Sequence, residues 1–377
     1  MDSVTQAALG AAIGGAVLGR HLGRRAVLFG AVLGTLPDLD VVIDYGDAVA
    51  NVTRHRGFSH SLFVLAGLAT TLALLVRRLT PLRDIGLGRW LAFFGLCLMT
   101  HPLLDAMTTY GTQIWWPLDV HPTAWPLVFI IDPLYSLPLL AGLIVALITG
   151  NGYRAPTWGL ALSCAYLIVS LGAKTLVDHR LTPVLAEHGL AESPRLIQPT
   201  PFNILLWRAT IIDDNDYHET LVGVFDGDHS PTLETFSRGA SLEPVALASD
   251  AGRRLDWFAG PFLRFDSVTR DERETLVATD LRLGFPGFHP FRYALAERQG
   301  VEWQPLATTR QLPEAGGDDG AAMRRLVGRI LAPEPMLCTS RFVPREWIVE
   351  VPAPCRQPAH DGRRAAERPP AERPEPR

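Results

Sequence analysis

Glutamate is missing from the first half of this 377-residue chain. No Glu occurs from Met1 to Ala186, where long apolar stretches dominate, whereas acidic residues are frequent from Glu187 onward. Lysine is also scarce, because Lys174 is the only one and Arg supplies the other cations. The formal net charge of −4 argues against a nucleic-acid-binding protein, which normally carries a strongly basic domain. The change in composition predicts a lipid-embedded first half and a soluble second half.

Several common catalytic motifs are absent as well. The chain has no His-Glu-x-x-His, no P-loop and no Gly-x-Ser-x-Gly. These absences exclude the commonest kinds of metalloprotease, nucleotide hydrolase and serine hydrolase. A basic stretch before the first apolar segment is also missing, since Asp2 stands there and Arg20 follows the segment. We therefore expect no removable signal peptide.

Six apolar segments occupy the first half. They are Val4–Gly19, Ala26–Leu36, Ser61–Val76, Trp90–Thr100, Pro126–Gly150 and Thr157–Ala173. Only Pro126–Gly150 comfortably reaches the ~20 residues that a bilayer span needs, so the others must draw polar flanks into the interface. We predict an α-helical membrane domain over residues 1–176, with about five to six transmembrane or membrane-embedded helices.

Arginines between these segments predict the orientation. They follow the first, third and fifth segments, at Arg20, Arg24, Arg25, Arg77, Arg78, Arg83, Arg89 and Arg154. Loops rich in Arg are typically cytoplasmic. By alternation, the other segment ends and the domain after Lys174 should lie on the non-cytoplasmic side, where Trp115, Trp116 and Trp125 are placed like an interfacial aromatic belt.

Residues 177–355 are predicted to form a smaller, β-rich soluble domain. Strand patterns over Thr200–Phe225 and Thr275–Leu283 contain or precede turn-forming residues, which predicts a small antiparallel sheet. Cys338 and Cys355 would lie in a compartment that permits disulfides, and their pairing stays open. Cys97 and Cys164 fall inside apolar segments and are expected to be packing residues. Residues 356–377, rich in Pro, Arg, Glu and Ala, are expected to be a disordered tail.

Three polar clusters lie at segment ends that should emerge on one face of the membrane: Pro37–Asp40, His55–His60 and His101–Asp105. His101 and Asp105 are four residues apart, so on a helix their Cβ atoms would lie ~5–6 Å apart and could chelate one ion. A buried, hydrogen-bonded pair is the alternative. Membrane context favours a ligand pair, because ionisable groups near hydrocarbon are costly and usually functional.

Two carboxylates of the first cluster are candidate metal ligands. Asp38 and Asp40 follow a proline that should end the preceding helix. Alternate residues of an extended chain point the same way, so both carboxylates could converge on one spot. Asp38 is the preferred ligand, and a solvated turn remains the alternative for one of the two.

The second cluster combines two imidazoles with a guanidinium. His60 is a predicted metal ligand, whereas His55 could either bind metal or act on substrate. Arg56 could hold an anionic group such as phosphate, or anchor the chain at the lipid headgroups. Gly57 would allow a tight turn, and Ser59 could cap a helix that starts at His60.

Asp132 lies just inside the fifth apolar segment, where a carboxylate needs a partner. It could be a ligand, a carboxylate that orients a ligand histidine, or a partner for a backbone group that Pro133 leaves free. The second role is preferred.

These motifs, in this order, closely resemble those of the YdjM-like family of bacterial inner-membrane proteins. The resemblance rests on Met1–Gln6, Pro37–Asp40, His55–Ser61, His101–Gly111 and Phe129–Tyr135. It covers the first ~140 residues strongly and the β-rich region more diffusely. The family is described as metal-dependent hydrolases and as LexA-binding. The resemblance therefore implies a multi-pass protein of the bacterial inner membrane and a metal more firmly than it implies a substrate.

A more limited likeness is to the helical zinc phospholipase C and nuclease group. Asp38, His60, His101 and Asp105 would match that group's ligands, which implies zinc. Gln6 departs from the pattern, because the group commonly has His at this position. Gln is a poor zinc ligand, so a multi-metal site would be reduced and catalysis comes into doubt.

The resulting expectation is a membrane hydrolase that cleaves a phosphoester or lipid-linked substrate with a metal-activated water. His55 and Arg56 would be catalytic, and the ligand set fits Zn, Mn or Fe. The expected partners are the bilayer and a small-molecule or lipid phosphoester, and the metal site would lie on the non-cytoplasmic side. The alternative is a non-catalytic membrane scaffold that keeps a degenerate metal site and binds a protein partner.

Overall fold

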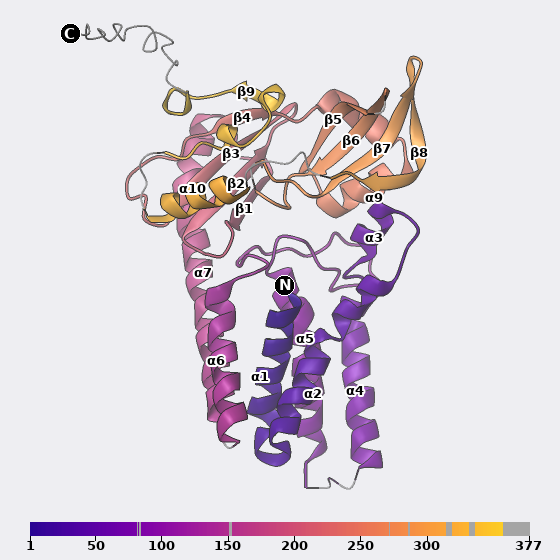
Figure 1. The fold of residues 1–377 in the computed structure, drawn as a ribbon, viewed down its shortest axis with the longest axis vertical. Helices are drawn as coiled ribbons and strands as arrows, with labels where there is room; N and C mark the ends of the chain where they lie inside the picture. Colours follow the sequence, from indigo (N-terminus) through magenta and orange to yellow (C-terminus); the bar gives the residue numbers. More distant parts are fainter. Residues whose placement is uncertain are drawn as a thin grey trace, which may run out of the picture.

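The computed structural model describes residues 1–356 except 81, 83, 151–152, 271, 286, 314–318 and 332–335. The chain has a helical N-terminal half and a C-terminal domain that carries two antiparallel sheets (Figure 1). This architecture confirms the predicted fold class. The predicted tail beyond Arg356 lies outside the described residues, and so does Arg83 of the loop predicted to be cytoplasmic.

Six helices form a bundle below the sheets in Figure 1. They are α1 (Ser3–Leu22), α2 (Arg24–Thr35), α4 (Leu62–Leu79), α5 (Leu87–Ala106), α6 (Pro133–Thr149) and α7 (Arg154–Glu187). The short elements η1 (Pro37–Val42), α3 (Ala48–Arg54) and η2 (Phe58–His60) connect α2 to α4. They lie at the end of the bundle that faces the sheets.

Helices α1 and α2 form a hairpin with very close backbones. A Cβ atom added to Gly10 would lie 2.2 Å from the Gly30 carbonyl oxygen, and one added to Gly34 would lie 2.5 Å from the Gln6 carbonyl oxygen. Small residues permit such contact between helices in membranes. Each helix has two glycines four residues apart, Gly10 and Gly14 in α1 and Gly30 and Gly34 in α2. The residues that permit this contact therefore lie within one short part of the sequence.

Three helices among the described residues are long and apolar enough to cross a membrane, namely α4, α5 and α7. This is fewer than the five or six predicted. Helix α6 is apolar but has 17 residues, and α2 has only 12. The apolar segments were correctly located, but several are shorter as helices than a full span.

The C-terminal domain consists of two sheets, where the sequence predicted one small sheet. The first sheet has the order β1-β2-β3-β4-β9 and the second β5-β6-β7-β8. Their strands are β1 (Arg195–Pro199), β2 (Leu206–Ile212), β3 (Asp216–Gly223), β4 (Glu234–Ser237), β9 (Ile348–Glu350), β5 (Leu263–Arg270), β6 (Arg273–Asp280), β7 (Arg292–Gln299) and β8 (Glu302–Gln311). Helices α8 (Glu243–Leu247), α9 (Asp250–Ala259) and α10 (Asp319–Leu331), with η3 (Ala240–Leu242), η4 (Thr339–Arg341), η5 (Arg345–Trp347) and η6 (Ala353–Cys355), complete the domain.

The two halves share cores at two places. Val49 of α3 is buried with Leu255 of α9 and Phe265 of β5. The end of α7 packs Val177 and Leu181 into the core of the first sheet. Helix α7 thus runs through the predicted domain boundary at 176 without a break, and that boundary stays a prediction.

The cysteines divide as their positions suggest. Cys338 and Cys355 form a disulfide. Cys97 is a buried packing residue in α5, as expected. Cys164 is exposed on α7, which departs from the expected packing role.

Candidate metal centre

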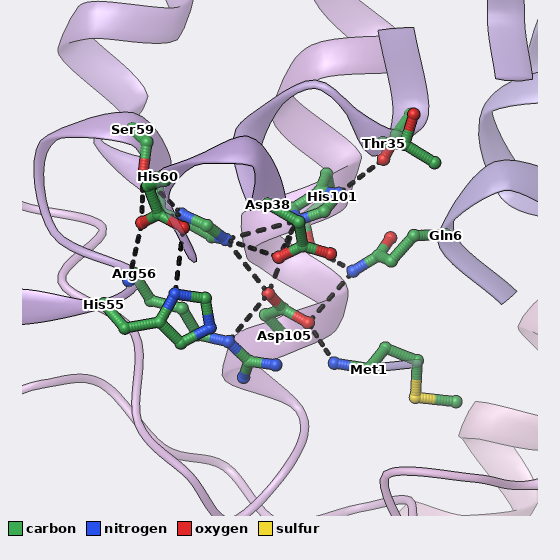
Figure 2. Close-up of polar contacts among 12 residues, drawn as sticks. Met1, Gln6, Thr35, Asp38, His55, Arg56, Ser59, His60, His101 and Asp105 are labelled. Atoms are coloured by element: carbon green, nitrogen blue, oxygen red, sulfur yellow. Dashed lines mark hydrogen bonds and ion pairs between the residues drawn. The ribbon is translucent and has the colours of Figure 1, made fainter. Parts of the chain in front are cut away.

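Four predicted ligands meet at the end of the bundle that faces the sheets. Asp38 comes from η1, His60 from η2, and His101 and Asp105 from one face of α5. One potential ligand atom of each lies within 4.8 Å of the others, and Figure 2 shows the four side chains pointing toward one another. The segments that carry them are up to 67 residues apart in sequence, from Asp38 to Asp105.

The distances between the donor atoms are uniform. The Nε2 atoms of His60 and His101 are 3.2 Å apart. Asp38 Oδ1 lies 3.4 Å from the first and 3.3 Å from the second. Asp105 Oδ2 lies 3.3 and 3.5 Å from the same two atoms. A tetrahedron with metal bonds of ~2.0–2.1 Å has edges of about 3.3–3.4 Å, and these five separations are close to that length, as donors to one divalent ion would be.

Both histidines have their other ring nitrogen engaged. His101 Nδ1 donates to the Gly34 carbonyl oxygen at 2.6 Å. His60 Nδ1 lies 2.9 Å from Ser59 Oγ, and that hydroxyl donates to Asp40 Oδ2 at 2.6 Å. The Ser59 oxygen is therefore free to accept from Nδ1. A proton on each Nδ1 leaves the lone pair of each Nε2 available, as a metal-binding histidine requires.

Asp40 organises the loop beside the centre. Besides Ser59, it accepts from the Arg56 backbone N–H at 3.0 Å and contacts His55 Nδ1 at 2.9 Å. Burial raises the pKa of Asp40, but the hydrogen bonds from His55 and Ser59 outweigh it and leave that pKa below its usual value. Asp40 was predicted as a ligand beside Asp38, and the structure places it behind the histidines, outside the group of four.

Asp105 is surrounded by cationic and polar groups. Its Oδ1 pairs with the Met1 amino group and accepts from Gln6 Nε2 at 2.9 Å. Its Oδ2 lies 3.2 Å from Arg56 Nε but has no hydrogen-bond donor among the described residues. A buried carboxylate oxygen without a donor is costly. A cation between Asp105 and the two imidazoles would satisfy it.

Arg56 does not face solvent. Its side chain is 5% exposed, lies over the Tyr110 ring at 4.9 Å and reaches Thr108 Oγ1 at 3.5 Å. The expected tight turn also occurs at Arg56, with φ of 60°, and not at Gly57, whose φ is −87°. The guanidinium of Arg56 is packed against Asp105. That Arg56 holds an anion stays a prediction.

His55 stands between the centre and an open cavity. Its side chain is 23% exposed, and its ring packs edge-on against Tyr110. The cavity, about 420 Å³, extends from His55 along η1 and α3 to Phe291 and Tyr293 below the second sheet. His55 therefore lies beside the four ligands, with a ring centroid 6.0 Å from that of His60.

Asp132 and Ser59 have roles that differ from the preferred ones. Asp132 caps α6 by accepting from the backbone N–H groups of Leu134 and Tyr135, and it also accepts from Tyr166 Oη. Of the three roles considered for Asp132, this matches the partner of backbone groups near Pro133 and not the carboxylate that orients a ligand histidine. Ser59 does not cap a helix, because α4 starts at Leu62 and Ser61 is its cap.

The structure adds groups that the sequence did not reveal. The Met1 amino group and the Gly34 carbonyl are backbone atoms, so no residue type signals them. Gln6, noted only as a departure from a pattern, contacts Asp105 directly, and its Oε1 has no partner among the described residues. A polar residue inside the first apolar segment was the available signal.

Comparison with known proteins supports the expected resemblance. Residues 1–177 match the model of the family described as YdjM inner membrane protein. Inner membrane protein YbcI of Escherichia coli (strain K12) is 39% identical over 93 residues, which are 24% of this chain and 52% of that protein. The chain thus spans about half the length of YbcI. Uncharacterized protein YfhP of Bacillus subtilis (strain 168) is 26% identical over 273 residues, 71% of this chain and 80% of that protein. No solved structure matches.

Proposed function

Starting from the match of residues 1–177 to the YdjM inner membrane protein family, we propose that this inner-membrane protein is a metal-dependent phosphoesterase. Asp38, His60, His101 and Asp105 would hold one divalent ion. The observation that carries the proposal is the set of four donor atoms separated by 3.2–3.5 Å in every pair measured above. Their oxygen and imidazole chemistry suits Zn, with Mn and Fe as alternatives.

The charge of the centre suits an anionic substrate. Asp38, Asp40 and Asp105 contribute three negative charges, and Arg56 with the Met1 amino group contributes two positive ones. The sum is one negative charge, which a divalent ion would change to one positive charge. A positive centre at the edge of a membrane attracts a phosphate ester.

An ion held by these four side chains would need a fifth position for water, and there it would lower the pKa of that water toward ~7 and polarise a phosphoryl oxygen. His55 would move the proton, because Asp40 orients its ring through Nδ1 and its side chain lines the 420 Å³ cavity. Arg56 would hold Asp105 in its ligating position, since its Nε lies 3.2 Å from Oδ2. Met1 and Gln6 would fix the second oxygen of the same carboxylate.

A lipid-linked substrate fits the rim of the cavity. Val41 and Val42 of η1 line the cavity and are 71% and 80% exposed, and Leu39 beside them is 59% exposed. These side chains follow α2 at the end of the bundle, where a bilayer surface would lie. Apolar groups at the mouth of a polar site favour an amphiphile over a small soluble ester.

The sidedness proposed is non-cytoplasmic for both the centre and the sheet domain. The Arg-rich loops lie at the other end of the bundle. A disulfide between Cys338 and Cys355 suits an oxidising compartment outside the cytoplasm.

A non-catalytic scaffold is the second candidate. Arg56 and the Met1 amino group already compensate Asp105, so the cluster could hold the helices together without an ion. In that case the sheet domain would bind a protein partner.

Metal analysis separates the two candidates. We expect the detergent-purified wild-type protein to contain about one divalent ion per chain, and His101→Ala to lose both ion and phosphoesterase activity, because no spare donor replaces Nε2. His21→Ala is the control, since His21 is an exposed residue near the other end of α1. Wild-type protein that takes up no Zn, Mn or Fe and cleaves neither phospholipid nor a generic phosphodiester would establish the scaffold instead.

A further inference from the structure

A second cavity, distinct from the 420 Å³ cavity beside His55, is lined by other residues of the His55–His60 loop. Its volume is about 340 Å³, and Gly57 and Phe58 of that loop are among the residues that line it. Two guanidinium groups line it, Arg54 from α3 and Arg254 from α9. We call it the arginine hollow, defined by Arg54, Arg254, Phe58, Trp116, Trp257 and Asp119.

Both guanidinium groups are held in place by aromatic rings. Arg254 lies 4.8 Å from the Trp257 ring centroid, and its Nε donates to Thr53 Oγ1 at 3.0 Å. Arg54 lies 5.3 Å from the Tyr45 ring centroid. Stacking of this kind orders the flat guanidinium while leaving its N–H edges free to bind an anion.

The charge in the arginine hollow is not balanced. Throughout the described ranges of the chain, no carboxylate lies within ion-pair distance of Arg54 or Arg254. Asp119 is the only acidic residue in the lining and leaves a net formal charge of one positive unit. Burial, together with the charge of Arg54, lowers the pKa of Arg254, so the two cations repel each other across the hollow. An anion between them would relieve that repulsion.

The rim of the hollow is apolar and exposed. Phe58, Trp116 and Leu118 are 43%, 40% and 57% exposed. Phe58 lies four residues before the start of the candidate span α4, which places this rim at the level of the bilayer surface. Aromatic residues at that level are typical of the membrane interface.

We propose that the arginine hollow binds the phosphate of an anionic glycerophospholipid. The two guanidinium groups would take the phosphate, and Phe58, Trp116 and Leu118 would contact the glycerol and upper acyl chains. The site is separate from the metal centre and needs no metal. It goes beyond the proposed hydrolase activity, because lipid held here would fix the loop that carries His60 at the membrane surface.

Native mass spectrometry of the full chain in a neutral detergent tests this site. Phosphatidylglycerol and phosphatidylcholine are added separately, and inorganic phosphate and glycerol phosphate serve as soluble competitors. We expect wild-type protein to retain phosphatidylglycerol in preference to phosphatidylcholine. The double variant Arg54→Gln/Arg254→Gln should weaken that retention by roughly 10- to 30-fold, the effect of removing two interfacial cations.

Arg253→Gln is the matched control. Arg253 precedes Arg254 on α9 but pairs with Asp250 and lies outside the hollow, so its loss should leave retention unchanged. Arg54→Gln alone changes an exposed side chain and guards against loss of folding in the double variant. Equal retention in the double variant and wild type, or an equal loss in Arg253→Gln, overturns the proposal. Displacement by inorganic phosphate at low millimolar concentration would show a soluble-anion site and overturn the lipid assignment.

Discussion

Single residues in this centre are positioned by hydrogen bonds at their far side. Ser59 lines neither the 420 Å³ nor the 340 Å³ cavity, yet it links His60 Nδ1 to Asp40. Gly34 does the same for His101 through a carbonyl oxygen. The two imidazoles therefore depend on groups that a search for metal ligands alone overlooks.

Ser59→Ala should weaken metal binding without abolishing it. The variant removes the acceptor for His60 Nδ1 and frees the ring to rotate or to change tautomer, and losses of this kind are typically ~10–100-fold in affinity. Competition with a zinc chelator measures the change. Ser267→Ala, at an exposed position on β5, is the control. Unchanged zinc affinity in Ser59→Ala would mean that the hydroxyl does not hold His60.

At this scale the sequence predicted the four side chains and that they meet on one face of the membrane domain, but not the hydrogen bonds that orient them. Asp38, His60, His101 and Asp105 were recognisable because each ends an apolar segment. The choice between Asp38 and Asp40 depended on how the chain leaves α2. Pro37 starts the 3-10 turn η1 there and not an extended chain, so the two carboxylates point to different partners.

Among the elements, the α1–α2 hairpin sets the position of the centre. Gly34 is in van der Waals contact with Gly10 and supplies the carbonyl that holds His101. Any separation of the two helices therefore moves an acceptor of the metal centre. The sequence analysis did not identify this hairpin, because the close contact between the two backbones becomes visible only in the structure.

Gly30→Ala tests this link. A Cβ atom at Gly30 would lie 2.2 Å from the Gly10 carbonyl oxygen, so the helices must move apart. We expect a loss of thermal stability together with a loss of bound metal. Gly95→Ala is the matched control, because a Cβ atom at this helical position has nothing within 4 Å. Replacing a helical Gly by Ala without a clash should raise the stability of the fold by roughly 0.5–1 kcal/mol.

Thermal unfolding and metal content of both variants are the measurements. If Gly30→Ala keeps the stability and metal content of Gly95→Ala, the hairpin does not control the centre.

For the whole molecule, the order of the helices predicts where each loop lies. Three helices, α5, α6 and α7, separate the loop after Thr80 from the segment after Glu192. If all three cross, their odd number puts these two points on opposite sides of the membrane. Helix α6, at 17 residues, decides the count, because it is shorter than a usual span.

Reporter fusions after Thr80 and after Glu192 measure this directly. We expect a cytoplasmic signal from the first and a non-cytoplasmic signal from the second. A third fusion after Thr149 should match the first. Identical signals at Thr80 and Glu192 would show that one of the three helices does not cross.

Fold class followed from composition because lipid and water select different residues. The two sheets and their joint core with α3 did not, since Val49 lies in a short connection between two apolar segments and is buried by contact with the sheet domain. Contacts between residues so far apart in sequence leave no local pattern.

Helix α7 is long enough to extend beyond a bilayer and to support the sheet domain at its end. Its 34 residues, at about 1.5 Å each, make a rod of about 50 Å, whereas the hydrocarbon layer is about 30 Å thick. The remaining length carries the first sheet, while α3 ties the second sheet to the loop before α4. Helix α7 supports the sheet domain on one side, and α3 connects it to the bundle on the other. The sheet domain therefore lies over the end of the bundle that carries the candidate metal centre (Figure 1). We therefore expect molecules to approach the candidate centre from the side, through the cavity that His55 lines.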